Sequence, residues 1–109
     1  PYLGVGALAP LVTAATRSGR GLFVLAGTSN PEGRALQTSR DADNETVESR
    51  VMREIAELNE GSAPFGSVGV VLGATRQRPA FDLARLGGPY LVPGVGAQGA
   101  GPEDVARLG

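Results

Sequence analysis

The sequence predicts an α/β fold in which about three parallel strands alternate with helices. Three apolar runs carry this prediction, at residues 21–26, 67–72 and 89–92. None of them alternates polar with apolar residues, which is typical of strands buried on both faces in a parallel sheet. The segments between them have helical spacing. The strands begin about 46 and about 22 residues apart, which fits right-handed crossover connections.

Two amphipathic helices are predicted, one before the first strand and one between the first and second strands. Apolar residues recur every three or four positions in both, which is the spacing of one helix face. They are Leu8, Leu11, Val12 and Ala15 in the first helix and Val47, Val51, Ile55 and Leu58 in the second. Asn44 is the predicted N-cap of the second helix, with Glu45 and Glu48 in its first turn. Residues 59–61 are expected to end it.

Two shorter helices complete the predicted alternation of helices and strands. One spans residues 80–86 and ends at the Gly87-Gly88 pair. The other begins at Pro102, because Pro is tolerated at the first helical position and the two acids that follow favour a helix N-terminus. An open doubly wound sheet and part of a (β/α)8 barrel both fit this order. Three strand–helix units are somewhat under half of a barrel of about 250 residues.

The two ends of the sequence indicate an internal fragment. The first residue is Pro, the only Met is Met52, and the sequence stops one or two turns into the helix predicted from Pro102. We therefore expect residues 1–109 to be one fragment of a single domain.

Composition excludes several classes of chemistry for this chain. Cys, His, Trp and Lys are absent, and all ten basic residues are Arg. A disulfide, a thiolate nucleophile, a Cys-ligated zinc, a Ser-His-Asp triad and a Schiff-base lysine therefore have no residues to form them. The net charge of −1 predicts no nucleic-acid partner, because such binding needs a basic surface.

No membrane segment is expected either. Residues 1–16 are uncharged, but they lack a basic flank, contain Gly4, Gly6 and Pro10, and fall short of the ~20 residues of a spanning helix. The absence of Cys fits a cytoplasmic protein, which is the location that we expect.

The loops after the three strands are the candidate ligand-binding segments, because both architectures bind ligands there. These loops are residues 27–33, 73–76 and 93–99. About ten polar residues follow the first loop, and such a segment either covers a ligand or forms a mobile connection. Thr28, Ser29 and Asn30 fit either simple turn chemistry or a site. Arg76 and Arg78 follow a strand end and are candidates to contact an anion, whereas the carboxylates are expected mainly on solvated helix faces.

The third loop matches the pattern G-x-G-x-x-G through Gly94, Gly96 and Gly99. In a dinucleotide site the third glycine lies within the helix, where it permits close packing of helix and strand. Here Pro102 favours a helix start after all three glycines. The loop therefore either presents backbone N–H groups to a single phosphate or is a glycine-rich turn.

Taken together, these segments resemble the orotidine 5'-phosphate decarboxylases of the longer bacterial branch, which are also similar to the protozoal enzymes. The matching stretches are residues 1–4, residues 21–25 leading into Thr28-Ser29-Asn30-Pro31, residues 68–71 with 73–75, and residues 89–99. The last stretch is the most specific. The resemblance covers essentially the whole chain and implies strands five to seven of a (β/α)8 barrel, that is, part of the C-terminal half. The implied reaction removes CO2 from orotidine monophosphate to give UMP, with no cofactor and no metal.

The resemblance also implies roles for particular residues. Thr28 and Ser29 are expected beside the pyrimidine, Leu25 against it and Pro93 in the wall of the ring pocket. Gln98 is expected to reach the phosphate, with backbone amides near Gly96 and Gly99. No catalytic residue is expected in the chain, because the family's Lys and Asp set belongs to strands two and three and its phosphate-binding Arg follows strand eight. Relatives often carry Arg directly before Thr-Ser-Asn, where this chain has Gly27.

The implied partner is a small molecule, orotidine monophosphate, with the full-length protein forming a homodimer. Two other functions remain open at this point. One is a different phosphate-binding α/β enzyme that depends on a nucleotide, and the other is a non-catalytic binding domain on the same scaffold. In every case the isolated chain is expected to be inactive as a decarboxylase and to fold poorly alone, because three parallel strands leave two unpaired edges.

Overall fold

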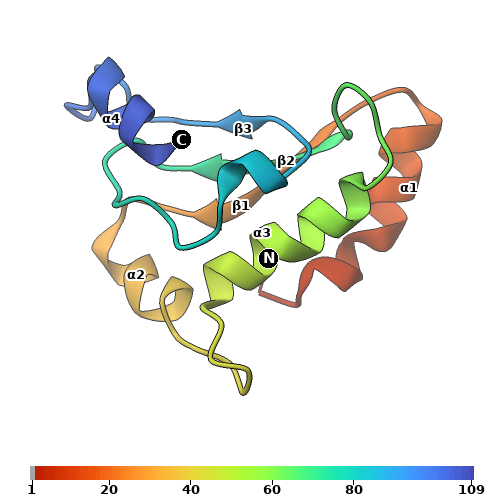
Figure 1. The fold of residues 1–109 in the computed structure, drawn as a ribbon, viewed down its shortest axis with the longest axis horizontal. Helices are drawn as coiled ribbons and strands as arrows, with labels where there is room; N and C mark the ends of the chain where they lie inside the picture. The colour runs from red at the N-terminus through yellow and green to blue at the C-terminus, as the bar shows by residue number, and fades with distance from the viewer. Residues whose placement is uncertain (1) are drawn as a thin grey trace.

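Three parallel strands form the centre of the fold, in the order β1-β2-β3 (Figure 1). The computed structural model describes residues 2–109. Strand β1 spans Leu22–Gly27, β2 spans Val68–Leu72 and β3 spans Tyr90–Leu91. The three predicted strands are thus confirmed, although the third is shorter than the apolar run that predicted it.

Helices flank the sheet and join its strands. They are η1 (Val5–Leu8), α1 (Ala9–Arg17), α2 (Pro31–Gln37), α3 (Val47–Asn59), η2 (Leu83–Arg85) and α4 (Pro102–Leu108), where η denotes a 3-10 helix. In Figure 1, α3 lies in front of the sheet beside α1, whereas α2 and α4 lie near the carboxyl ends of the strands. Within residues 2–109, no helix is long and apolar enough to cross a membrane.

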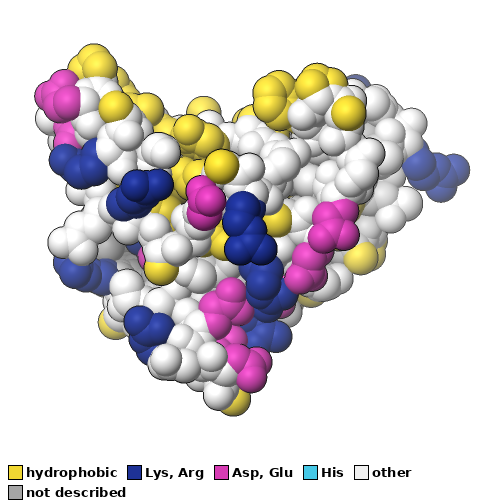
Figure 2. Space-filling view, viewed as in Figure 1, with side chains coloured by type: hydrophobic (Ala, Val, Ile, Leu, Met, Phe, Trp, Pro, Cys, Tyr) yellow, Lys and Arg dark blue, Asp and Glu magenta, His cyan; other side chains and the backbone are white. Residues whose placement is uncertain are grey.

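The core lies between α3 and the sheet. Met52 and Ile55 on α3 are fully buried, as are Val70 and Leu72 on β2. Each fully buried aliphatic side chain contributes roughly 1.5–3 kcal/mol. The opposite face of α3 is charged, and Figure 2 shows Arg and acidic side chains side by side over it. Val51 and Ile55 thus lie on the buried face that the apolar spacing predicted, whereas Leu58, predicted on the same face, is 48% exposed.

The start of α3 differs from the prediction. Asn44 is not the N-cap, because Thr46 holds that position and its hydroxyl oxygen accepts a hydrogen bond from the Ser49 N–H at 3.3 Å. Asn44 instead adopts a left-handed conformation with φ of 62°, which Asn tolerates better than most residues. Its N–H closes a turn onto the Asp41 carbonyl at 3.0 Å. Glu45 therefore precedes the helix, and only Glu48 lies in its first turn.

The polar segment after β1 is not a loop throughout. Residues 31–37 form α2, with Pro31 at its start and Glu32 in its first turn. Pro is suited to the first position of a helix, where its missing N–H costs nothing, and Asn30 precedes it as the N-cap.

The helix predicted over residues 80–86 is only the short η2. The Asp82 carboxylate accepts a hydrogen bond from the Ala84 N–H at 3.1 Å, which caps a single turn. Gly87, with φ of 62°, then turns the chain toward β3.

One face of β1 is open. Phe23 is 51% exposed and Leu25 is 58% exposed, whereas Val24 and Ala26 are buried against the helices. The expectation that every strand is buried on both faces was therefore wrong for β1, and also for β3, whose two residues are exposed, although it holds for most of β2.

Asn59, the last residue of α3, ties three segments together at the amino end of the sheet. Its side-chain amide donates to the Val68 carbonyl at 2.7 Å and to the Leu86 carbonyl at 3.1 Å, and it accepts from the Val68 N–H at 3.2 Å. The side chain is buried. The sequence indicated only that a helix ends here, since the partners lie 9 and 27 residues away.

Replacing Asn59 by Leu is expected to lower the free energy of unfolding by about 3 kcal/mol, since three buried backbone groups lose partners worth roughly 1 kcal/mol each. Glu60→Gln, one position on and exposed, is the control and is expected to change it by less than about 0.5 kcal/mol. Denaturant unfolding of the natural protein that contains residues 1–109 measures both. An Asn59→Leu variant as stable as the control would contradict this role.

Candidate functional site

The parallel register brings the three loops after the strands to one edge of the sheet. The Gly73 N–H donates to the Gly27 carbonyl at 2.9 Å, and the Ala74 N–H donates to the Pro93 carbonyl at 2.9 Å. These bonds extend the sheet by one step on each side of β2. A register shift between Leu25 and Gly27 adds one residue to β1 and redirects the chain where its loop begins. The loops therefore lie side by side at the left of Figure 1.

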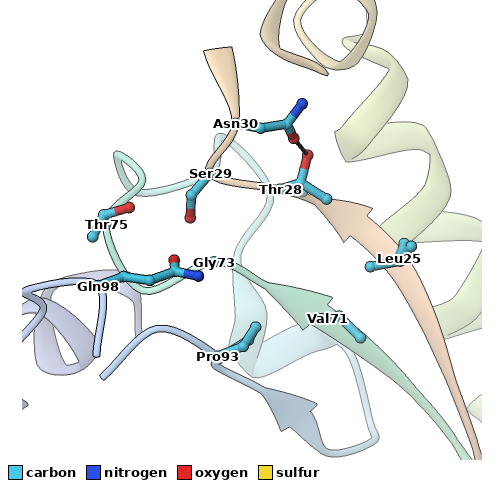
Figure 3. Close-up of a pocket in the computed structure, with 10 residues that line it drawn as sticks. Leu25, Thr28, Ser29, Asn30, Val71, Gly73, Thr75, Pro93 and Gln98 are labelled. Carbon is cyan, nitrogen blue, oxygen red and sulfur yellow. Dashed lines mark hydrogen bonds between the residues drawn. The ribbon is translucent and has the colours of Figure 1, made fainter. Parts of the chain in front are cut away.

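An open cavity of about 500 Å³ lies at this edge (Figure 3). Residues of β1 and β2 and of the loops after all three strands line it: Leu25, Gly27, Thr28, Ser29, Asn30, Val71, Gly73, Thr75, Pro93 and Gln98. All five residues predicted to bind substrate are among them, namely Leu25, Thr28, Ser29, Pro93 and Gln98. Residues up to 73 positions apart in the chain, 25 and 98, thus share one cavity.

Ser29 projects into the cavity because Gly73 leaves room for it. A Cβ built on Gly73 would overlap the Ser29 hydroxyl. Figure 3 shows the Ser29 side chain directed toward Gln98. Its hydroxyl is open to a ligand, since it has no hydrogen-bond partner within residues 2–109.

Gln98 faces Ser29 from the third loop. Its N–H donates to the Gly94 carbonyl at 3.3 Å, and its side chain lies across Gly94, where an added Cβ would approach the Gln98 Oε1 to 2.8 Å. Ser29 and Gln98 therefore present one hydroxyl and one amide to the same space (Figure 3).

Thr28 is held by hydrogen bonds to Gln37, the last residue of α2. Its N–H donates to the Gln37 Oε1 at 3.0 Å, and its hydroxyl accepts from the Gln37 Nε2 at 2.6 Å. The Thr28 hydroxyl in turn donates to the Asn30 Oδ1 at 2.6 Å. Thr28 is thus more constrained than Ser29.

Gly96 and Gly99, predicted to bind phosphate, do not line the cavity. The Gly96 N–H donates to the Ala100 carbonyl at 2.8 Å and the Gly99 N–H to the Gly96 carbonyl at 3.0 Å, so both are engaged inside their own loop. Gln98 is the member of the predicted phosphate set that reaches the cavity.

The third loop ends where the sequence predicted, because α4 begins at Pro102 after all three glycines. The Gly101 N–H donates to the Asp104 carboxylate at 2.8 Å. This bond, with one from Arg107, holds the pKa of Asp104 below its ordinary value. The arrangement differs from a dinucleotide fingerprint, whose third glycine lies in the helix.

The cavity wall carries no ionisable acid or base. Apolar side chains come from Leu25, Val71 and Pro93, and neutral hydrogen-bonding groups come from the remaining side chains. Within residues 2–109, no group of three or more Asp and Glu side chains is placed to hold a metal ion. Such a wall can bind and orient a flat polar ring, but it cannot transfer protons at neutral pH.

Comparison with known proteins assigns the family. Residues 1–109 match the model of the Orotidine 5'-phosphate decarboxylase / HUMPS family. The chain belongs to this family. It is 55% identical over 105 residues to the orotidine 5'-phosphate decarboxylase of Salinispora tropica and 48% identical over 109 residues to that of Streptomyces coelicolor.

The chain spans only part of these family members. The two matches cover 96% and 99% of this chain but 38% and 39% of the curated relatives. A crystal structure of a candidate orotidine 5'-phosphate decarboxylase from Streptomyces avermitilis matches with a TM-score of 0.90 and 47% sequence identity. That match covers 99% of this chain and 38% of the other protein. Membership in the orotidine 5'-phosphate decarboxylase family confirms the resemblance and the partial (β/α)8 barrel, and it sets aside the doubly wound sheet.

Several residues around the site were missed or misplaced by the sequence. Glu48, expected on a solvated face, is buried and pairs with Arg76, which was a candidate to contact an anion. The sequence did not indicate that Gln37 contacts the site, because no local pattern marks it as a partner of Thr28, nine positions earlier. Thr75 could have been found, since it follows a strand of the same sheet.

Replacing Gly96 by Ala is expected to lower the free energy of unfolding by about 1–2 kcal/mol. Its φ of 79° disfavours a Cβ, even though the surrounding space is open. Gly6→Ala is the matched control, because its surroundings are equally open and its φ is not positive. Denaturant unfolding of the natural protein that contains residues 1–109 compares them. Equal stability of the two variants would show that the loop is not constrained at Gly96.

Proposed function

We propose that residues 1–109 form the ring-pocket and phosphate side of an orotidine 5'-phosphate decarboxylase. The whole protein would convert orotidine monophosphate to UMP and CO2 in pyrimidine synthesis. One observation carries this proposal: the five residues that the family resemblance assigns to the substrate converge on one cavity at the carboxyl ends of the strands. The names of the relatives support the same reaction.

The roles follow from the chemistry of the cavity wall. Leu25 and Pro93 would contact the faces of the pyrimidine, since apolar side chains suit a flat ring. Thr28 and Ser29 would lie at its polar edge. The side-chain amide of Gln98 would bind the phosphate. Because Gln98 lies beside Ser29, the residues that bind the two ends of the substrate would be neighbours.

The chemical step would depend on the rest of the protein. Loss of CO2 leaves a carbanion-like carbon, which needs charges held in place before the reaction and a proton donor. The cavity wall is uncharged and the chain has no Lys. This segment would therefore contribute binding energy from the ring and from the remote phosphate, which can be used to organise the reacting site. No residue of the chain is assigned a catalytic role, and no cofactor or metal is proposed.

The remaining assignments follow from the family resemblance. We propose that the full-length protein acts in the cytoplasm as a homodimer, with orotidine monophosphate as its small-molecule partner and without nucleic acid or membrane.

The isolated chain of residues 1–109 is expected to have no decarboxylase activity and to fold poorly. β1 and β3 each have an unpaired edge, and Phe23 and Leu25 are uncovered on the open face of the sheet. Circular dichroism measures its folding, and loss of orotidine monophosphate absorbance measures turnover. Turnover by the purified chain above a buffer blank would contradict this expectation.

In the full-length protein, Gln98→Ala is expected to lower kcat/KM for orotidine monophosphate about ten- to a hundredfold. A hydrogen bond to a charged group contributes about 1.5–3 kcal/mol, and 1.36 kcal/mol corresponds to a factor of ten. Gln77→Ala is the matched control, since Gln77 is exposed and lies outside the cavity. Steady-state kinetics test both, and a wild-type protein without turnover would refute the proposed function.

A further inference from the structure

A partly buried polar network holds Thr28 and joins three elements that are distant in sequence. Arg76, in the loop after β2, forms an ion pair with Glu48 of α3. Its Nη1 also donates to the Oε1 of Gln37, the last residue of α2, at 3.3 Å. Gln37 then holds Thr28 through both its amide oxygen and its amide nitrogen.

The network has a fixed direction. The Arg76 guanidinium can only donate, so it requires the oxygen of the Gln37 amide, and the Thr28 N–H requires the same oxygen. The Gln37 nitrogen must then donate to the Thr28 hydroxyl, which leaves the hydroxyl proton for Asn30 at 2.6 Å. Asn30 passes the direction on by donating to Glu32 at 3.2 Å. The side-chain bonds from the cation to the final carboxylate are therefore all donated the same way, whereas the Thr28 N–H donates back to Gln37.

Gly27 provides the space for Arg76. A Cβ built on Gly27 would overlap the Arg76 guanidinium, which therefore packs directly against the backbone of a residue that lines the cavity. This contact accounts for Gly27 at a position where the resemblance leads one to expect Arg.

Stability is a poor explanation for the buried pair. The side chains of Arg76 and Glu48 are only 12% and 8% exposed, and replacing such a pair by apolar residues is often neutral. The Arg76 Nε is also buried without a partner within residues 2–109, which adds a desolvation cost. What the pair achieves is a fixed guanidinium at the start of the network.

We propose that Arg76, fixed by Glu48, is a positioning residue that acts through Gln37 to orient Thr28 and its loop for the substrate. The effect on substrate rests on the proposed function, whereas the effect on the loop does not. Arg76 does not line the main cavity and is assigned no contact with the substrate.

The test uses Arg76→Met combined with Glu48→Leu in the full-length protein. The denaturation midpoint is expected to stay close to that of the wild type, whereas kcat/KM for orotidine monophosphate falls roughly tenfold, chiefly through KM, because small displacements of positioning groups have large kinetic effects. Gln37→Ala is expected to cause a similar loss and to add almost nothing to the double variant, since both act through one network. An unchanged kcat/KM, or a full additional loss from Gln37→Ala, would overturn the proposal.

Two further variants test whether the loss of activity arises from misfolding and whether it is specific to Arg76. Arg76→Lys keeps a charge for Glu48 but lacks the guanidinium fork, so it is expected to fold and to show the same rise in KM. Arg50→Met with Glu54→Leu removes the exposed ion pairs of Arg50 with Glu54 and Asp41 and is the matched control, with unchanged kinetics expected. A wild-type KM in Arg76→Lys, or an equal loss in the control, would refute the role of Arg76.

A measurement independent of activity separates this proposal from the proposed function. Hydrogen exchange of the Thr28 amide, which donates to Gln37, is expected to accelerate severalfold in Arg76→Lys and to stay unchanged in the Arg50 and Glu54 control. Faster exchange in a protein without decarboxylase activity would support the positioning network and would refute only the proposed decarboxylase function. Unchanged exchange in Arg76→Lys would refute the network even in an active enzyme.

Discussion

The backbone hydrogen bonds that continue the sheet past its strands are the constraint on which the site depends. The Gly27 carbonyl accepts from Gly73 and the Pro93 carbonyl accepts from Ala74, so the loops after β1 and β3 are both fixed to the loop after β2. Parallel strands place all their carboxyl ends at one edge, which is why a cavity can be built from residues so distant in the chain. Moving any strand by one residue would turn its side chains to the opposite face and would dismantle the cavity.

Polar side chains fix the strands at both ends. Some act at the amino ends of the strands, and others act at the loops that follow their carboxyl ends. Asn59 fixes the beginning of β2 to the end of α3 and to η2. At the other edge, Arg76, Glu48 and Gln37 join α2 and α3 to the loop that carries Thr28. The apolar core between α3 and β2 gives stability, whereas these directional contacts determine where the ends of the strands lie. The neutral side chains of the cavity wall are therefore held in defined positions, although the wall itself carries no charge.

Local residue patterns were sufficient to predict the elements with strong signals. The apolar runs predicted the three strands, and the spacing of Val47, Val51 and Ile55 predicted the face of α3 that is buried. The family resemblance named Leu25, Thr28, Ser29, Pro93 and Gln98, which the structure gathers in one cavity. One error falls where a residue type suits two conformations, since Asn44 can cap a helix or adopt a left-handed turn. Others, such as the exposed face of β1 and the burial of Glu48, depend on contacts that no local pattern records.

The sequence by itself determined the order of the strands, the absence of a proton-donating lysine and the class of side chains available to the ligand, because these depend on residue identity and short-range spacing. Only the tertiary structure decided that Glu48 is buried, that Gly27 makes room for Arg76, and that Gln37 holds Thr28. The partners of Arg76 lie 28 and 39 residues earlier in the chain. Contacts over such separations depend on how helices dock on the sheet, and that docking is set by packing of the whole segment.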